Sequence, residues 1–424
     1  MTRYADTTAF LFSLQRMSAK LGLDNIIALL EVLERPERRW PALHVAGTNG
    51  KGSTAAMLES VLRAAGYRVG LYTSPHLVDF TERIRVDRVP IPPERVIAMT
   101  ETLRSTIDRL QPSFFEVATA MAFRHFADAE VDVAVVETGM GGRLDSTNVV
   151  APLVTLISPV GLDHQQYLGD TMTAIAAEKG GIIKAGVPCI TANRDPGVLA
   201  VLAEICEKKG IPLERSYENR TYRIREMCLD GTRFDLDTGS GRFDHLFLNL
   251  PGDYQLENLL LAVAGLEAVA ARFPVTAAAL REGLGAVRWP GRLERVCDDP
   301  PVLLDVSHNP EGMGRTLAFL NGYWPAESIE AVVFLQEDKD YRAIAGMLAS
   351  AVARVWAVRL PFGKPLPAER LAAAVREAGG RAEVAADLET VRRRWSAPGN
   401  GGRRWLIIGS HYLAGAAYGL FQSS

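Results

Sequence analysis

What the sequence lacks excludes several classes of protein. It has only four cysteines, Cys189, Cys206, Cys228 and Cys297, and they form no CxxC pair, so structural disulfides and a zinc site are not expected. No apolar run approaches the ~20 residues of a membrane-spanning helix. The longest run, 259–266, ends at Glu267. The N-terminal segment has no basic start followed by an apolar core, so we expect no signal peptide and a cytoplasmic location.

An excess of charge of either sign is also absent. The chain has 47 Lys and Arg residues against 50 Asp and Glu residues, which leaves a formal net charge of −3. A chain with this balance is not expected to bind a nucleic-acid backbone or an anionic membrane surface. Its 424 residues, 48% of them apolar and 23% charged, are ordinary for a globular protein of two or three domains.

Strand-like and helix-like segments alternate through the first half of the chain. The pattern predicts strands near 42–47, 67–74, 131–139, 152–160 and 187–193, and helices near 53–66, 115–129 and 172–186. Such alternation is typical of a parallel sheet that helices cover on both faces. Residues 223–252 instead alternate apolar and polar residues around turns such as Asp230-Gly231, which predicts a small antiparallel patch.

A second α/β unit is predicted after Pro290-Gly291. Five strand-like segments follow this break, at 301–309, 331–337, 354–360, 381–386 and 403–410. A unit of about 130 residues is large enough to fold alone. We therefore expect two α/β domains, 1–288 and 289–424.

The segment HVAGTNGKGSTAAML (44–58) indicates a phosphate-binding loop. Glycines let backbone N–H groups converge on phosphate oxygens, and the start of the following helix adds a partial positive charge. Lys51 would contact the β- and γ-phosphates, and Ser53 is a candidate magnesium ligand. The segment departs from the pattern GxxxxGK[ST], because residue 45 is Val and Gly52 separates Lys51 from Ser53. A purely structural glycine turn is the alternative.

Two further polar positions follow predicted strands. Glu137 ends one strand, and Asp163-His164 follows the next. Ligands of open α/β sheets bind outside the carboxyl ends of the strands, so these residues are candidates for a metal site, with ordinary loop polarity as the alternative.

The loop GTNGKGS resembles the nucleotide loop of the Mur ligase superfamily. The segments YTSPHL (72–77), ERIRV (82–86), ETGMGGRLDSTN (137–148), GLDHQQYLGD (161–170), EKGGIIK (178–184) and DVSHNP (305–310) occur in the same order as in the folylpolyglutamate synthase/dihydrofolate synthase family. The resemblance covers nearly the whole chain. It implies an N-terminal P-loop-type Mur ligase central domain, with a mostly parallel sheet and a small antiparallel patch, and a C-terminal Rossmann-like α/β domain.

The resemblance also implies roles for individual residues. Those expected to bind ATP are Asn49, Gly50, Lys51, Gly52, Ser53, Asn258, Arg292 and Asp305. Those expected to hold magnesium are Ser53, Ser74, Glu137 and His164, the histidine on the resemblance alone because Mg²⁺ prefers oxygen. Those expected to line the pteroate or folate pocket are Ser113, Phe114, Phe115, Glu116, Leu144, Asp145 and Ser146. Lys179 matches a carbamylated lysine, and Ser307 and His308 are expected to face glutamate.

The implied reaction is an ATP-dependent ligation through an acyl phosphate. L-glutamate would be joined to dihydropteroate, or to the γ-carboxylate of reduced folates, with two Mg²⁺ sites and room for a monovalent cation. The enzyme is expected to be a monomer that acts on small molecules. Two alternatives stay open: a cell-wall Mur ligase, and a regulatory nucleotide-binding switch without ligase activity. ERIRV, SFFE (113–116) and ETGMGGRLDSTN favour the folate branch, and a switch would have no use for the domain that carries DVSHNP.

Overall fold

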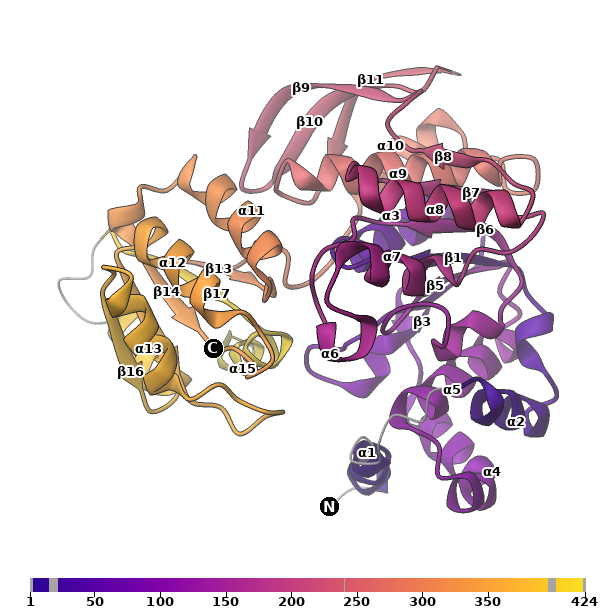
Figure 1. Ribbon diagram of the computed structural model, residues 1–424, viewed down its shortest axis with the longest axis horizontal. Coiled ribbons are helices and arrows are strands. Elements are labelled where there is room, and N and C mark those ends of the chain that lie inside the picture. The colour runs from indigo at the N-terminus through magenta and orange to yellow at the C-terminus, as the bar shows by residue number, and fades with distance from the viewer. Residues whose placement is uncertain (1–2, 15–21, 240, 396–401, 422–424) are drawn as a thin grey trace. The chain divides into compact units, whose positions relative to one another are not determined.

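The computed structural model describes residues 3–14, 22–239, 241–395 and 402–421 (Figure 1). The chain divides into two compact units, each with its own sheet. The first unit comprises Met1–Arg223, Phe234–Phe247 and Gln255–Val287, and the second comprises Ile224–Arg233, Leu248–Tyr254 and Arg288–Ser424. No helix in the described ranges is long and apolar enough to cross a membrane.

The first unit contains an eight-stranded sheet in the order β4-β3-β2-β5-β1-β6-β7-β8. The strands are β1 Ala42–Ala46, β2 Val69–Tyr72, β3 Ile84–Val86, β4 Val89–Pro90, β5 Val133–Glu137, β6 Pro152–Ile157, β7 Cys189–Thr191 and β8 Leu213–Arg215. The strands β2, β5, β1, β6, β7 and β8 pair in parallel, whereas β3 pairs antiparallel with β2, and β4 with β3, at one edge. The five strands predicted for this half are confirmed, and the short strands β3, β4 and β8 were not predicted.

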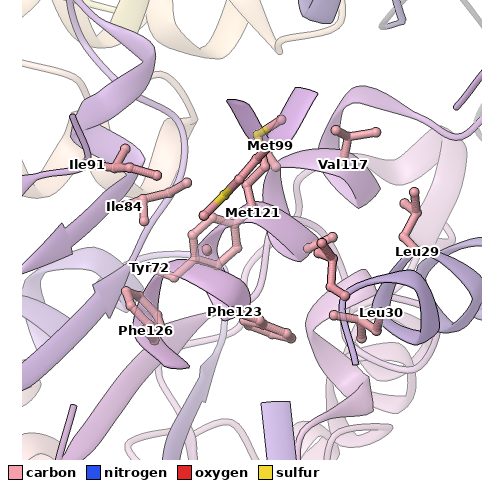
Figure 2. Close-up of a cluster of buried hydrophobic side chains, with 14 of the residues drawn as sticks. Leu29, Leu30, Tyr72, Ile84, Ile91, Met99, Val117, Met121, Phe123 and Phe126 are labelled. Carbon is pink, nitrogen blue, oxygen red and sulfur yellow. The ribbon is translucent and has the colours of Figure 1, made fainter. Parts of the chain in front are cut away.

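Helices cover both faces of this sheet. They are α1 Arg3–Ser13, α2 Asp24–Val32, α3 Lys51–Ala64, α4 Pro93–Leu110, α5 Phe114–Asp128, α6 Gln165–Leu168, α7 Met172–Gly180, α8 Pro196–Lys208, α9 Tyr254–Ala268 and α10 Ala277–Gly285. Figure 2 shows the core on one face, where Tyr72 of β2 packs near Met121, Phe123 and Phe126 of α5. A side chain at Gly265 of α9 would meet Leu156 of β6, so the other face is covered as well. The helices predicted near 53–66, 115–129 and 172–186 correspond to α3, α5 and α7.

Three strands form a separate small sheet in the order β11-β10-β9. They are β9 Thr221–Cys228, β10 Gly231–Asp237 and β11 Arg242–Leu248. Only Leu229 and Asp230 connect β9 to β10, and a connection this short joins antiparallel strands. The predicted antiparallel patch is confirmed.

The second unit contains a six-stranded sheet in the order β12-β13-β17-β14-β15-β16. Its strands are β12 Glu294–Asp298, β13 Pro301–Asp305, β14 Ile329–Val333, β15 Arg354–Val358, β16 Ala382–Ala385 and β17 Arg404–Ile408. Its helices are α11 Pro310–Asn321, α12 Tyr341–Ala351, α13 Ala368–Glu377, α14 Leu388–Trp395 and α15 His411–Phe421. The five predicted strands pair in parallel, and the unpredicted β12 pairs antiparallel with β13. Both units are α/β, which confirms the predicted fold class.

Candidate active site

The loop between β1 and α3 is a glycine turn that side chains would disrupt. Gly47 and Gly50 have φ angles of 149° and 86°. A Cβ atom at Gly47 would lie 1.9 Å from Ser158 Oγ, and one at Gly50 would lie 2.1 Å from Asn258 Oδ1. Positive φ and close packing together require glycine at both positions. The loop therefore presents backbone groups, which suits the binding of phosphate.

The segment after β6 holds this loop in place. The N–H groups of Thr48 and Asn49 donate to Pro159 O at 2.9 and 3.2 Å. Thr48 Oγ1 donates to Gly161 O and accepts from Gly161 N–H, at 3.0 Å in each case. Ser158 Oγ donates to Asn49 O at 2.8 Å. Because β1 and β6 are parallel neighbours, the loops that follow them support each other at the carboxyl edge of the sheet.

Lys51 is the first residue of α3 and directly follows Gly50 of the loop. Its Nζ donates to Thr48 O at 3.2 Å and lies 4.0 Å from Glu137 Oε1. Ser53, in the first turn of the same helix, is only 1% exposed. The lysine charge and the N-terminus of α3 both favour an anion here.

Glu137 reaches the same edge because it ends β5, in register with Val45 of β1. The carboxylate is buried, and its Oε2 accepts from Ser74 N–H at 3.3 Å. The structure thus brings Lys51, Ser74 and Glu137 together. A buried carboxylate with the hydroxyl groups of Ser53 and Ser74 provides the oxygen donors that Mg²⁺ prefers.

His164 lies in the segment after β6, three residues beyond Gly161. It precedes α6 with a φ of 52°, and its N–H donates to Asp163 Oδ1 at 2.9 Å. The same segment supports the nucleotide loop, so His164 and that loop share one edge of the sheet.

Lys179 lies at the end of α7, where the local sequence alone is typical of a solvated lysine. In the structure the side chain is buried, and its Nζ donates to Gly47 O at 2.6 Å. Burial, and next the repulsion from Lys51, lower the pKa of Lys179 to about 7. A local reading would therefore have been wrong, because the partner of Lys179 is a carbonyl group of the nucleotide loop.

Four candidate pocket residues lie at the start of α5, and all four have structural partners. Ser113 and Glu116 form a capping box, in which Glu116 Oε2 accepts from Ser113 N–H at 2.6 Å and Glu116 N–H donates to Ser113 Oγ at 3.3 Å. Phe114 packs in the hydrophobic core. Phe115 is half-buried, and a Cβ atom at Gly139 would lie 2.5 Å from its Cζ. Phe115 is therefore the aromatic ring that borders the loop after β5.

That loop, residues 139–148, is organised around Asp145. Its Oδ2 accepts from the N–H groups of Gly139 and Met140, both at 2.9 Å. Its Oδ1 accepts from Thr147 N–H at 3.0 Å and from Thr147 Oγ1 at 2.5 Å. Burial raises the pKa of Asp145, and these hydrogen bonds oppose that rise. Both carboxylate oxygens are used within the loop, so Asp145 shapes it from within.

The two other candidates in this loop adjoin Asp145. Leu144 is half-buried, and Ser146 is buried at the start of the short 3₁₀ helix η4 Ser146–Val149. They flank the residue that holds the loop together.

Asn258 of α9 belongs with the nucleotide loop in the first unit. It is 4% exposed, its Nδ2 donates to Gln255 Oε1 at 2.9 Å, and its Oδ1 faces Gly50. This arrangement fixes the orientation of the amide.

The remaining candidates lie in the second unit, around the end of β13. Asp305 is buried, and it accepts from Leu293 N–H at 3.0 Å and from Ser307 N–H at 2.8 Å. His308 Nδ1 lies 2.9 Å from Val306 O. The preceding loop carries Arg292, whose Nη1 donates to Gly291 O at 3.1 Å.

Sequence reasoning missed several residues that hold the loops of the site in place through hydrogen bonds. His44 lies within β1 and contacts Thr147 of loop 139–148. Ser158 follows β6 and contacts Asn49 O, and Lys184 contacts Asn148 of loop 139–148. The signal that could have found His44 is a polar residue within an otherwise apolar strand. Its partner, Thr147, is 103 residues away in the sequence, so the pairing has no local signature.

Comparisons with known proteins agree with this architecture. The profile of the Mur ligase middle domain matches residues 45–266, and that of the Mur ligase glutamate ligase domain matches residues 291–411. The folylpolyglutamate synthase of Lacticaseibacillus casei is 38% identical over 369 residues, which cover 84% of this chain and 86% of that protein. The dihydrofolate synthase/folylpolyglutamate synthase of Bacillus subtilis is 37% identical over 350 residues, with 80% and 81% coverage. The structure of Mycobacterium tuberculosis folylpolyglutamate synthase complexed with ADP superposes with a TM-score of 0.91 at 33% identity, covering 99% of this chain and 98% of that one.

Proposed function

Because the chain belongs to the folylpolyglutamate synthase/dihydrofolate synthase family of Mur ligases, we propose that it joins L-glutamate to a pteroate or folate carboxylate with ATP. The acceptor is dihydropteroate, the γ-carboxylate of reduced folates, or both. The observation that carries this proposal is the grouping of Lys51, Glu137 and Ser74 at a glycine loop that presents its backbone. Residues 1–288 hold ATP and the pteroate or folate, and residues 289–424 supply the glutamate side.

The reaction proceeds in two steps. A carboxylate oxygen of the pteroate or folate attacks the γ-phosphorus of ATP, which forms an acyl phosphate and releases ADP. The amine of glutamate then attacks the acyl carbon, and an amide bond forms with loss of a proton from the amine. Inorganic phosphate leaves and carries away the carboxylate oxygen that had attacked the γ-phosphorus. Such chemistry depends on position and charge more than on covalent work by side chains.

The nucleotide is held by the residues that the resemblance assigned. The backbone of Asn49, Gly50 and Gly52 cradles the phosphates, and Lys51 neutralises them. Asn258, Arg292 and Asp305 are the other residues proposed to contact ATP. The Mycobacterium tuberculosis relative forms a complex with ADP, which supports nucleotide binding by this chain.

Ser53, Ser74, Glu137 and His164 would hold Mg²⁺ in two sites. Bound there, the metal would supply charge neutralisation around the transferred phosphoryl group. The donor chemistry supports this assignment, since a buried glutamate and two serines provide oxygen ligands.

Lys179 is proposed to be carbamylated, as the family resemblance suggests. Carbamylation requires the neutral amine, which attacks carbon dioxide with loss of a proton. Its pKa of about 7 supports this step, because much of the amine is then neutral near physiological pH. The product would place an anionic group beside Gly47 O and Lys51.

The pteroate or folate ring is proposed to bind between the start of α5 and loop 139–148. Phe115 offers the half-buried ring surface, and Ser113, Phe114 and Glu116 hold it on α5. Leu144, Asp145 and Ser146 form the facing loop. Ser307 and His308 are proposed to contact the incoming glutamate.

The wider assignments rest on composition and family. We propose a cytoplasmic monomer whose partners are ATP, glutamate, dihydropteroate and reduced folates, with neither nucleic acid nor membrane as a partner. The balanced charge supports the last point, that neither nucleic acid nor an anionic membrane is a partner.

Product mass spectrometry tests the proposal. The enzyme is incubated with ATP, Mg²⁺, glutamate and either dihydropteroate or tetrahydrofolate, and each component is omitted in turn. We expect a product heavier by one glutamyl residue only in the complete mixtures with an accepted substrate. ATP hydrolysis without a glutamylated product from either substrate would contradict the proposed function.

A further inference from the structure

A buried hydrogen-bond chain joins the strand under the nucleotide loop to the loop 139–148. His44 lies in the middle of β1 and is fully buried. Its Nε2 lies 2.8 Å from Thr147 Oγ1, which in turn lies 2.5 Å from Asp145 Oδ1. The other oxygen of Asp145 accepts from the N–H groups of Gly139 and Met140.

The direction of this chain follows from its chemistry. An ionised carboxylate accepts hydrogen bonds and cannot donate, so the hydroxyl proton of Thr147 points to Asp145. The oxygen of Thr147 then accepts, and His44 must carry its proton on Nε2. His44 Nδ1 is buried without a hydrogen-bond partner among the described residues. Burial lowers the pKa of His44 to about 3, and nearby Lys184 adds to this, so the ring is neutral, as the tautomer requires.

A second set of contacts ties the far end of the loop. Lys184 Nζ donates to Asn148 O at 3.0 Å and to Asn148 Oδ1 at 2.7 Å. Asn148 Nδ2 donates to Arg143 O at 2.9 Å and to Gly181 O at 3.1 Å. The end of the loop is therefore fixed through Asn148, whereas its start at 139–140 depends on Asp145.

We infer that His44 and Thr147 are positioning residues that set the start of loop 139–148 for the pteroate or folate substrate. His44 is anchored in β1, between Val136 of β5 and Thr155 of β6, so it provides a rigid origin. Thr147 in turn fixes Asp145 by a hydrogen bond, and Asp145 fixes the amides of Gly139 and Met140. Gly139 lies against the ring of Phe115. The inference rests on the proposed function, because it assigns the substrate that this loop meets.

Thr147→Val and Thr147→Ser form a matched pair for the test. Valine keeps the shape but removes the hydroxyl group, whereas serine keeps the hydroxyl group. We expect Thr147→Val to raise the KM for the pteroate or folate substrate about tenfold, as the loss of one buried hydrogen bond implies. The Kd for ADP, measured by calorimetry, should change less than about twofold, because the nucleotide loop does not depend on the Thr147 hydroxyl group. Thr147→Ser should stay near the wild type in both quantities.

His44→Gln and His44→Leu give a second pair, since glutamine can place an N–H near the position of Nε2. Glutamine should preserve the KM and leucine should raise it. Equal impairment by Thr147→Ser and Thr147→Val, an unchanged KM in Thr147→Val, or a parallel loss of ADP affinity would each overturn the inference.

Amide hydrogen exchange separates this inference from the proposed function. The Gly139 and Met140 amides should exchange faster in Thr147→Val than in Thr147→Ser, whatever the substrate. If the wild type makes no glutamylated product, the proposed function fails, and the exchange rates still decide whether the chain positions the loop. If neither removal variant folds, slow exchange of these amides in the wild type supports the inference, and exchange at the rate of an exposed loop contradicts it.

Discussion

The nucleotide loop, residues 47–53, and the loop 139–148 lie at the ends of adjacent strands but are stabilised in different ways. The nucleotide loop is held to the segment 158–161 by both backbone and side-chain hydrogen bonds, and its close packing requires glycine at positions 47 and 50. The loop 139–148 is held by the buried side chains of Asp145, Thr147 and His44. Both loops have distant partners, but the glycines that the nucleotide loop requires form a local sequence pattern, whereas the buried side chains that hold loop 139–148 form none.

The largest effect is expected at the charge of the nucleotide loop. Lys51→Ala removes the cation that lies 4.0 Å from Glu137, and we expect kcat to fall about a hundred- to a thousandfold, as when one preorganised electrostatic group is lost. Steady-state kinetics at saturating ATP measures this. The melting temperature should change little, because Lys51 is partly exposed. Near-normal turnover would show that Lys51 does not act on phosphate.

The next effect should separate the two loops. Asp145→Ala leaves the amides of Gly139 and Met140 without their buried acceptor, at a cost of about 2 kcal/mol. We expect the KM for pteroate or folate to rise roughly thirtyfold if this free energy is lost from binding, with the ADP Kd nearly unchanged. Both constants are measured by kinetics and calorimetry.

Asp195→Ala is the matched control, because Asp145 caps the short helix η4 and Asp195 caps α8, accepting from Val198 N–H at 2.9 Å. It should cost about 1 kcal/mol of the free energy of unfolding and change neither constant. An equal loss of ADP affinity in Asp145→Ala would show that the two loops are not independent.

A smaller effect is expected from a side chain in the nucleotide loop. In Gly50→Ala the new Cβ would lie 2.1 Å from Asn258 Oδ1, so the loop must shift, and we expect ADP affinity to fall about tenfold. Gly66→Ala provides the control, because Gly66 has a φ of 93° and no atom within 4 Å of its Cβ position. Both variants should lose about 1 kcal/mol of stability from backbone strain. Equal ADP affinities in the two variants would show that the contact between a side chain at position 50 and Asn258 does not affect nucleotide binding.

The last effect is on stability alone and concerns the buried amine of Lys179. The folded-state pKa, about 7, lies below the unfolded value of 10.5, so above pH 7 the unfolded chain binds more protons and stability rises with pH. Relative to Lys179→Met, the free energy of unfolding of the wild type should rise by up to about 1.4 kcal/mol per pH unit between about pH 8 and pH 9. Denaturant titrations in buffer depleted of carbon dioxide measure the difference. Parallel pH curves would show that Lys179 stays charged when folded.

Sequence reasoning predicted those parts of the fold that have a period of their own. Strands such as β5, Val133–Glu137, are long apolar runs between helices, and the glycines of the nucleotide loop mark a turn. The strands β3, β4 and β8 span only two or three residues, too short for any period. The strand β12, Glu294–Asp298, contains three charged residues among five and follows closely on the predicted break at Pro290-Gly291, so no apolar run indicates it.

The candidate site was predicted unevenly for the same reason. Glu137 could be placed because it ends a strand beside the nucleotide loop. The burial of Lys179 could not be foreseen, because its acceptor, Gly47 O, is 132 residues away. The resemblance assigned Asp145 to the pocket, but only the structure shows that its carboxylate is used by its own loop. Which residues contact ATP, metal and folate stays a prediction.

The central claim is that a pteroate or folate carboxylate is activated as an acyl phosphate. The most direct test uses dihydropteroate or tetrahydrofolate whose acceptor carboxylate carries a heavy-oxygen label. After turnover with ATP, Mg²⁺ and glutamate, the inorganic phosphate is analysed by mass spectrometry. The account predicts one labelled oxygen in each phosphate released with product, because the attacking oxygen leaves with phosphorus. Unlabelled phosphate accompanying glutamylated product would contradict it.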